Sequence, residues 1–434
     1  MGSELYTHPR DLLVEYMARI YGYRMTTTSG GNLSIRDPGG EVWITPAKID
    51  KGRLQRSDIV LVRPDGSQEG EAPPSSELPL HQTIYRTRPD VHAIVHAHPV
   101  ALVAFSIVQQ VPATRVFHQA WRICGAGAFA PYRLPGSAEL GESIAGALGA
   151  RHSCVILENH GVVAVGADLP QAFQRFETFE FAGKSIIKAR LLGGEIRELS
   201  DADLALAGEQ TADAAEPTPP GTPTTAEQEV RTTLQDFVRR GYRQRLFIST
   251  HGTFSARVDG ASFVITPHDR DRGALERSDL VRIDAGRATA GSRPSHATAL
   301  HEAIYRRHPQ IGAIVNAAPV NVTAFSITNA VPDTRTIPES RLVVRSPVPA
   351  RFRLQFEDPH ALAELISPEQ PIAVLENDGV LVTGSTVLEA FDRLEVLEST
   401  AEALINAQAL GPLSPMDDGA IAELEAAFFP APQG

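Results

Sequence analysis

The chain has little cysteine, no excess of basic residues and no long apolar run, and each shortage excludes a class of protein. Its only cysteines are Cys124 and Cys154, too few for a disulfide framework or a thiolate metal site. Lys and Arg total 40 against 52 Asp and Glu, and the net charge of −12 disfavours a surface for nucleic acid or anionic lipid. No stretch approaches the roughly eighteen apolar residues of a membrane span, and the first residues lack an export signal. We therefore expect a cytoplasmic protein that binds a small molecule, with no nucleic acid and no membrane.

One sequence pattern occurs twice in the 434 residues. Ala93–Ile107 has the sequence AIVHAHPVALVAFSI, and Ala313–Ile327, 220 residues later, has AIVNAAPVNVTAFSI. Ser29–Arg36 and Thr250–Arg257 form a second pair, SGGNLSIR against THGTFSAR. A nearly constant offset between matching segments is the mark of tandem duplication. We therefore predict two copies of one domain.

A stretch rich in proline, threonine and small residues separates the copies. AGEQTADAAEPTPPGTPTTAEQ, at 207–228, has no apolar periodicity that could anchor it to a core. We predict a first domain at 1–206, a linker at 207–228, a second domain at 229–412 and a C-terminal tail at 413–434.

Within a copy, short β-rich runs alternate with helical patterns. EVWIT, DIVLVR, AIVHAH and CVILE have the composition of strands. The helical patterns are clearest at Pro9–Tyr23, Ser75–Arg88 and Leu169–Leu192. We expect an α/β domain in which helices cover a sheet, while periodicity leaves the strand order open.

Two histidines stand two residues apart in one predicted strand. His96 and His98 leave the same face of that strand, so both can reach one ion. His160 lies in the run Glu-Asn-His-Gly, where a second strand turns over at a glycine. Two histidines on an apolar strand are weak evidence for a metal, and a third ligand strengthens it.

The second copy shows which positions the framework needs. Residues kept in both copies, such as His81 with His301 and Tyr85 with Tyr305, are expected to serve packing. Three imidazoles and one carboxylate are absent from the second copy. Because drift on a solvated face would not select three distant histidines, we predict that they meet at one metal ion. The replacements are His96 by Asn316, His98 by Ala318, His160 by Asp378, Ser76 by His296 and Glu77 by Ala297.

Four linked motifs, SGGNLS, PPSSE, HAHP and ENHG, resemble the class II aldolase and adducin family over about Leu12–Leu192. The region of about Val230–Gln408 is similar in framework and degenerate in all four motifs. The resemblance implies two tandem three-layer α/β/α domains, each around a mostly antiparallel sheet. It also implies a divalent metal, zinc first, with manganese, iron or cobalt as alternatives.

The resemblance also assigns roles to residues. It makes His96, His98 and His160 the metal ligands and Glu77 the general acid/base. Glycines and a helix start next to the metal would form an anion cradle, although a serine there can also simply cap its helix. One departure concerns the segment Pro46-Ala47-Lys48, where the family commonly has a hydroxyl and a glycine; Lys48 could instead serve a carboxylate. The cradle residues are Gly30, Gly31, Asn32, Ser75 and Ser76.

Three neutral imidazoles leave a divalent ion its charge and open coordination sites, so a carbonyl and a neighbouring hydroxyl can chelate it. Cleaving the carbon–carbon bond beside that carbonyl leaves an enediolate, which the ion stabilises. The first expectation is therefore a metal-dependent lyase of the aldolase type. A decarboxylase uses the same electron sink, and an epimerase, a dehydratase and an iron oxygenase stay open. A non-catalytic, adducin-like binding protein is the alternative from another class.

Two further expectations concern His118 and assembly. The loop that contains His118 has no clear counterpart in the second copy, so His118 is a candidate substrate contact or second proton donor. The family resemblance implies rings of four domains with sites at the boundaries between neighbours. Two chains would then form a homodimer that mimics a fourfold tetramer, in which the second copy keeps a metal-free pseudo-active site.

Overall fold

The expected linker at 207–228 is only partly described by the structure, and helix α8 begins inside it at Thr225. Within the described part of the chain, no helix combines the length and apolar character needed to cross a membrane. The computed structural model describes residues 8–208, 218–219, 221–260 and 262–429.

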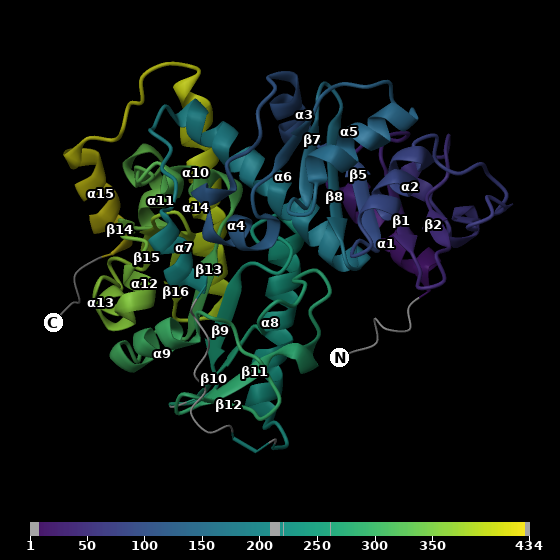
Figure 1. Cartoon of the computed structure of the whole chain (residues 1–434). Coiled ribbons are helices and arrows are strands. Elements are labelled where there is room, and N and C mark those ends of the chain that lie inside the picture. The colour runs from purple at the N-terminus through teal and green to yellow at the C-terminus, as the bar shows by residue number, and fades with distance from the viewer. Residues whose placement is uncertain (1–7, 209–217, 220, 261, 430–434) are drawn as a thin grey trace. The chain divides into compact units, whose positions relative to one another are not determined.

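The chain divides into two compact units (Figure 1). The first contains Met1–Thr114 and Ala120–Lys184, and the second contains Arg115–Gln119 and Ser185–Gly434. The units follow the duplication, except that two parts of the first copy belong to the second unit, Arg115–Gln119 and the end of the helix Leu169–Leu192 from Ser185 onward.

The first copy, or first repeat, alternates strands with helices as its sequence predicts. Its helices are α1 (Pro9–Gly22), α2 (Leu78–Thr87), α3 (Val100–Ile107), α4 (His118–Cys124), α5 (Ala138–Leu148) and α6 (Leu169–Leu192), and α7 (Asp201–Gly208) follows. Its strands are β1 (Asn32–Arg36), β2 (Val42–Ile44), β3 (Val60–Val62), β4 (Gln68–Glu69), β5 (Ala93–Ala97), β6 (Ala128–Ala130), β7 (Cys154–Leu157) and β8 (Gly161–Gly166).

The eight strands form one sheet in the order β4-β3-β2-β1-β5-β8-β7-β6. Every neighbouring pair is antiparallel except β6 with β7. The register of β1 with β5 sets Asn32 opposite His96. The sheet is therefore mostly antiparallel. His96, one of the two histidines of HAHP, lies on its central strand β5.

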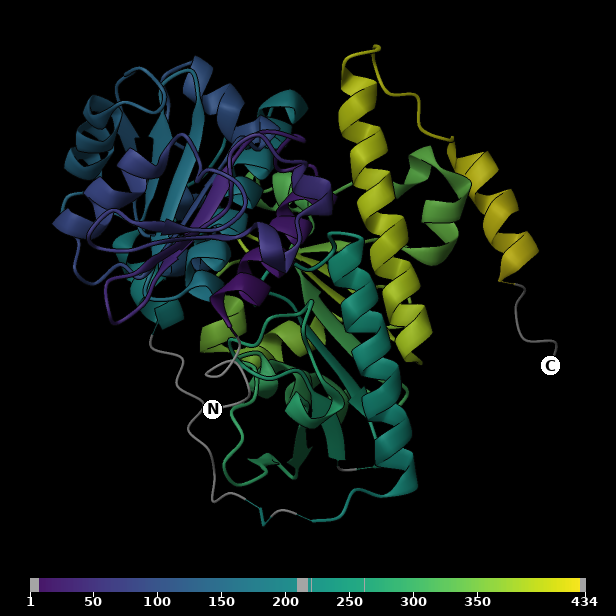
Figure 2. The same ribbon diagram turned by 90° about the vertical axis from the view of Figure 1, so that its right-hand side faces the viewer.

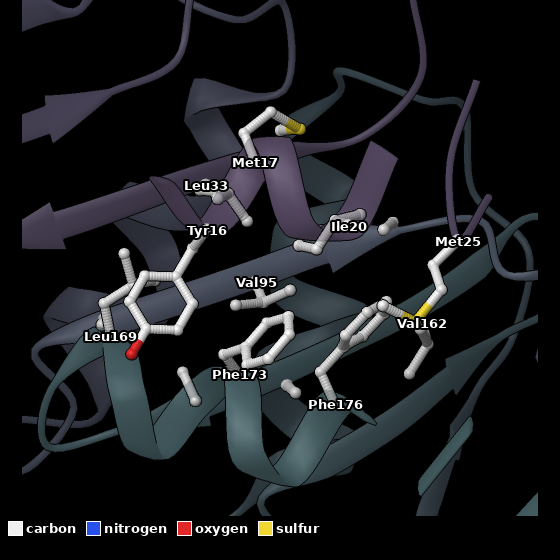
Figure 3. Close-up of a cluster of buried hydrophobic side chains, with 14 of the residues drawn as sticks. Tyr16, Met17, Ile20, Met25, Leu33, Val95, Val162, Leu169, Phe173 and Phe176 are labelled. Carbon is white, nitrogen blue, oxygen red and sulfur yellow. The ribbon is translucent and has the colours of Figure 1, made fainter. Parts of the chain in front are cut away.

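Helices cover both faces of this sheet. On one face α1 and α6 pack their apolar side chains against Leu33, Val95 and Val162 (Figure 3). On the other face α2 and α5 pack against residues such as Ile94 and Val163. Side chains of a strand alternate between faces, so Ala93, Val95 and Ala97 of β5 face one layer of helices, while Ile94 and His96 face the other. The three-layer α/β/α fold is confirmed.

The second repeat has the same architecture. Its sheet order, β12-β11-β10-β9-β13-β16-β15-β14, repeats that of the first, with β14 and β15 parallel. The helices α8 and α14 lie side by side (Figure 2), joined by Arg240 and Glu395 at 3.0 Å and by the edge-to-face rings of Phe237 and Phe391.

The elements of the second repeat have the following bounds. The helices are α8 (Thr225–Arg243), α9 (Thr298–Arg307), α10 (Val320–Ile327), α11 (Pro338–Val343), α12 (Leu354–Glu357), α13 (Pro359–Glu364), α14 (Val387–Gln408) and α15 (Asp418–Phe428). The strands are β9 (Thr253–Arg257), β10 (Ser262–Ile265), β11 (Val281–Asp284), β12 (Arg287–Ala288), β13 (Ala313–Ala317), β14 (Val348–Ala350), β15 (Ile372–Leu375) and β16 (Gly379–Gly384).

Candidate metal centre

Three histidines of the first repeat converge at the end of strand β5. His96 lies in β5, His98 follows it directly, and His160 is the last residue of the turn between β7 and β8. One ring nitrogen from each of the three lies within 4.8 Å of the others. The centroids of each pair of rings are 4.9 Å apart. Among the described residues, this is the group of histidine, cysteine and acidic side chains that can hold a metal ion.

Two glycines make room for this convergence. A Cβ on Gly161 would lie 2.6 Å from both the carbonyl oxygen of Ala97 and Cδ2 of His98, which is a steric clash. Gly31 has φ +70, and a Cβ there would lie 2.8 Å from the carbonyl oxygen of His96. Only glycine adopts such a backbone and allows such close contact without strain. The glycines of SGGNLS and ENHG therefore hold two loops against the HAHP segment.

Burial keeps two of the three imidazoles neutral. Desolvation lowers the pKa of His98 to about 3 and that of His160 to about 4, so both rings are neutral near pH 7. His96 lies fully buried with Nδ1 3.0 Å from the carbonyl oxygen of Val162, to which it donates. Its Nε2 then faces the cluster, the orientation that a hydrogen bond to a backbone carbonyl gives to metal-binding histidines.

Glu77 lies beside the three rings, at the N-cap of α2. Its Oε2 is 3.1 Å from Nε2 of His96 and accepts a hydrogen bond of 2.8 Å from Nδ2 of Asn32. Its Oε1 is 3.6 Å from Nε2 of His160. Burial raises the pKa of Glu77, but the two neighbouring imidazoles and the amide outweigh it and hold the pKa well below its ordinary value.

The donor set fits a divalent cation. Three imidazole nitrogens face one point, and a carboxylate stands next to them. Oε1 of Glu77 is buried and has no hydrogen-bond partner among the described residues. A buried oxygen of this kind costs free energy unless a cation or a substrate group satisfies it. The residues present therefore match a metal centre with an adjacent base.

The cradle residues have different surroundings. Gly31 and Asn32 are buried next to the histidines. Oγ of Ser75 accepts a hydrogen bond from the backbone N–H of Glu77 at 3.2 Å, in the turn before α2; Glu77 rather than Ser75 is the N-cap, and α2 has no side-chain cap. Ser76 and Lys48 are exposed.

Lys51 is a buried cation close to the segment Pro46-Ala47-Lys48, and its sequence pattern did not single it out. Its Nζ donates to the carbonyl oxygen of Pro46 at 2.7 Å, and burial lowers its pKa to about 8. Arg272, the residue 221 positions later, donates in the same way to the carbonyl of Pro267. A basic residue in both repeats indicates a structural part in this loop.

The structure places His118 in the second unit rather than with the three histidines of the first. Its Nδ1 lies 2.9 Å from Oδ1 of Asp378, and its ring packs against Phe352 and Phe356. Sequence comparison of the repeats could not reveal this, since the two residues are far apart in the chain.

His81 and Tyr85, expected to serve packing, also form buried hydrogen bonds. Oγ of Ser34 is 2.6 Å from Nδ1 of His81 and 2.7 Å from the hydroxyl of Tyr85. Nε2 of His81 is 2.5 Å from Oδ1 of Asn32. The sequence signal for this network is the retention of serine, histidine and tyrosine in both repeats.

Known proteins resemble this chain over less than half of its length. An L-fuculose phosphate aldolase of Methanococcus maripaludis is 34% identical over 162 residues, which are 37% of this chain and 86% of that protein. The 3-oxo-tetronate 4-phosphate decarboxylase of Haemophilus influenzae is 30% identical over 201 residues, 45% of this chain and 93% of that protein.

Among solved structures, one titled L-fuculose 1-phosphate aldolase is 31% identical and covers 48% of this chain and 97% of its own, with a TM-score of 0.42. The family model described as the class II aldolase and adducin N-terminal domain matches residues 11–187 and again residues 232–405. Two matches of this extent take in most of the sequence, and they coincide with the two sheets. The chain therefore belongs to the class II aldolase and adducin family, as a tandem duplication of its domain.

Proposed function

We propose that the first repeat is a divalent-metal-dependent lyase of the class II aldolase type. It would cleave the carbon–carbon bond beside the carbonyl of a small hydroxy-carbonyl substrate by retro-aldol chemistry. The observation that carries this proposal is the position of Glu77. A buried carboxylate oxygen without a hydrogen-bond partner faces a cluster of three imidazoles.

His96, His98 and His160 would hold the ion, and zinc suits three imidazole ligands, with manganese, iron or cobalt as alternatives. When bound, the ion supplies an electron sink for the substrate carbonyl and its neighbouring hydroxyl. The carbonyl of Val162 fixes the ring of His96, so this ligand needs no reorientation before it binds.

Glu77 would move the proton. Deprotonation of a substrate hydroxyl releases the aldehyde half in the cleavage direction, and protonation of the other half completes the reaction. Glu77 is ionised beside the three rings, and a carboxylate is the form of this side chain that can accept a proton. Asn32 holds one carboxylate oxygen, which leaves Oε1 for the reacting group.

The relatives suggest a phosphorylated substrate, since their names describe sugar phosphates and a tetronate phosphate. Gly31 lies against the carbonyl oxygen of His96, where the lack of a side chain would let an anion approach the backbone. The exposed side chain of Lys48 could also meet an anion.

Decarboxylation is the second candidate function. It is favoured by the similarity to the Haemophilus influenzae decarboxylase, which extends over nearly all of that protein. The same electron sink would stabilise the carbanion left by carbon dioxide. Release of carbon dioxide rather than of an aldehyde distinguishes the two reactions.

The second repeat would hold no catalytic metal, because Asn316, Ala318 and Asp378 replace the three histidines. We propose that it serves assembly. In the second unit, the segment after α6 covers the end of α10, with the N–H of Arg197 donating to the carbonyl oxygen of Ile327 at 3.0 Å. Ile327 is fully buried.

The equivalent face of the first repeat lies open. Ile107, the counterpart of Ile327, is 62% exposed, and the adjacent Val108 is 57% exposed. The segment that follows α14 in the second repeat is equivalent to the segment that follows α6 in the first. Its Leu410 is 90% exposed. We propose that a second chain provides this cover, so that two chains form a homodimer with alternating metal-bearing and metal-free domains.

Two measurements test the proposed chemistry. Purified protein loaded with zinc, manganese or cobalt and incubated with ketose phosphates and hydroxy-keto acids should release an aldehyde or carbon dioxide. Glu77→Gln should retain the metal and reduce turnover roughly 100-fold or more. Glu142→Gln, a change of an exposed carboxylate on α5, is the matched control. A metal-loaded protein that cleaves no member of a broad panel would exclude the lyase.

A further inference from the structure

A chain of buried hydrogen bonds leads from the sheet to Glu77. The hydroxyl of Tyr85 and Oγ of Ser34 are 2.7 Å apart, and Oγ of Ser34 is 2.6 Å from Nδ1 of His81. Nε2 of His81 is 2.5 Å from Oδ1 of Asn32, whose Nδ2 donates to Oε2 of Glu77 at 2.8 Å. All five side chains are buried.

The direction of each hydrogen bond follows from the carboxylate at the end. A carboxylate accepts only, so the NH₂ group of Asn32 must face Glu77 and its carbonyl oxygen must face His81. Nε2 of His81 therefore carries the proton, and Nδ1 accepts from the hydroxyl of Ser34. Burial lowers the pKa of His81 to about 3, so the ring stays neutral and keeps this tautomer.

The second repeat retains most of this chain without the carboxylate. Tyr305, Ser255 and His301 are joined at 2.8 and 2.7 Å, as their counterparts are in the first repeat. Nε2 of His301 again meets an amide oxygen, that of Asn316, at 2.7 Å. The position of Glu77 is taken by Ala297.

The amide comes from a different strand in each repeat. Asn32 on β1 is paired with His96 on β5, and in the second repeat Thr253 on β9 is paired with Asn316 on β13. An amide at either of these cross-strand positions reaches the same imidazole nitrogen. Tyrosine, serine and histidine thus form a common structural unit, while the amide on β1 is combined with a glutamate.

We propose that His81 is a positioning residue for Glu77 and that it acts by fixing the orientation of the Asn32 amide. Without the N–H of His81, the amide could turn its oxygen toward Glu77, where two oxygens would repel each other. The carboxylate would leave the position beside His96 and His160. This inference rests on the proposed metal site and its base.

The two repeats provide a matched pair of variants for the full-length protein. His81→Leu and His301→Leu remove equivalent imidazoles from equivalent networks, but only His81 connects to a carboxylate. Both should lower the melting temperature by several degrees, because each leaves a buried serine and amide unpaired. Cobalt loading, the visible absorption of the cobalt-loaded protein, and kcat and KM are then compared.

Only His81→Leu should change the cobalt spectrum, in the same sense as Glu77→Gln, and it should lower kcat roughly 10- to 100-fold with little change in KM. Cobalt stoichiometry should stay at the wild-type value. His81→Gln, whose amide can place a donor near Nε2, should restore much of both readouts. If His81→Leu cannot be purified, Asn32→Asp carries the test, because it replaces the donor that faces Glu77 with an oxygen.

The spectrum is read without substrate, so it separates this inference from the reaction class. Wild-type protein that binds no cobalt would contradict the proposed metal site. Wild-type protein that binds cobalt, with His81→Leu matching His301→Leu in spectrum and kcat, would show that the network is structural only. Loss of cobalt from His81→Leu would also overturn the proposal, because His81 would then support the metal ligands rather than position Glu77.

Discussion

His118 Nδ1 lies 2.9 Å from Asp378 Oδ1, and both side chains are largely buried. Asp378 occupies the position of the second repeat that corresponds to the third histidine of the cluster, His160. The same turn is held by Asn377, whose Nδ2 donates to the carbonyl oxygens of Val116 and Arg197 at 2.8 and 2.9 Å. The segment Arg115–Gln119 of the first copy therefore packs against the turn of the second repeat that corresponds to the turn of His160.

Removing this pair should reduce stability and leave the metal in place. We expect His118→Ala and Asp378→Ala each to destabilise the chain, and the double variant to cost less than their sum, with a coupling free energy of roughly 0.5–3 kcal/mol. Urea unfolding of the four proteins measures the coupling. Unchanged stability together with altered kcat or KM would return His118 to the role of substrate contact or proton donor.

Substituting the histidines of HAHP should abolish metal binding in a folded protein. His96→Asn and His98→Ala copy Asn316 and Ala318, residues that the same framework already accepts in the second repeat. Elemental analysis should show loss of the bound ion, while circular dichroism should match the wild type. His152→Ala, a histidine of the same repeat outside the cluster, should keep its metal. Unfolding of the first two variants would mean that the imidazoles serve the core.

The stability of the second unit should depend on pH through Glu398. This partly buried carboxylate accepts hydrogen bonds from the N–H groups of Asn321 and Val322 and from the Asn321 amide. Burial raises its pKa to about 7 from 4.5, although these hydrogen bonds lower it.

The sign of this dependence follows from proton binding. Between the unfolded pKa of 4.5 and the folded pKa of about 7, the folded state holds a proton that the unfolded chain has released. The contribution of Glu398 is therefore most favourable at low pH and declines as pH rises through 7. Melting temperatures of wild type and Glu398→Gln should diverge across this range, with the wild type showing the steeper decline. Parallel curves would contradict the raised pKa.

Charges on the open face of the first repeat should prevent dimerisation. Sedimentation equilibrium of the wild type should give the mass of two chains. Ile107→Asp with Val108→Asp should shift the protein to one chain, because the charges would be buried at the proposed contact. Leu388→Asp changes an equally exposed leucine at the start of α14 and should leave the dimer intact. A wild type with the mass of one chain would rule out the assembly.

The sequence by itself determined the duplication, the α/β class and the convergence of three histidines. It did so because a second, degenerate copy separates the residues that the framework needs from those that a site needs. The spacing of the four motifs was sufficient to identify the family, and both matched segments confirm that assignment.

Only the tertiary structure decided what several individual residues contact. Asn32 and Glu77 are 45 positions apart, and Asn377 lies 261 positions from Val116. Strand register and loop packing bring such pairs together, and neither is encoded by local periodicity. For this reason Asn32, placed in an anion cradle by its motif, proved to bind Glu77, and His81, expected to pack, proved to bind Asn32. His118, whose partner lies in the other repeat, could be located only once the chain was folded.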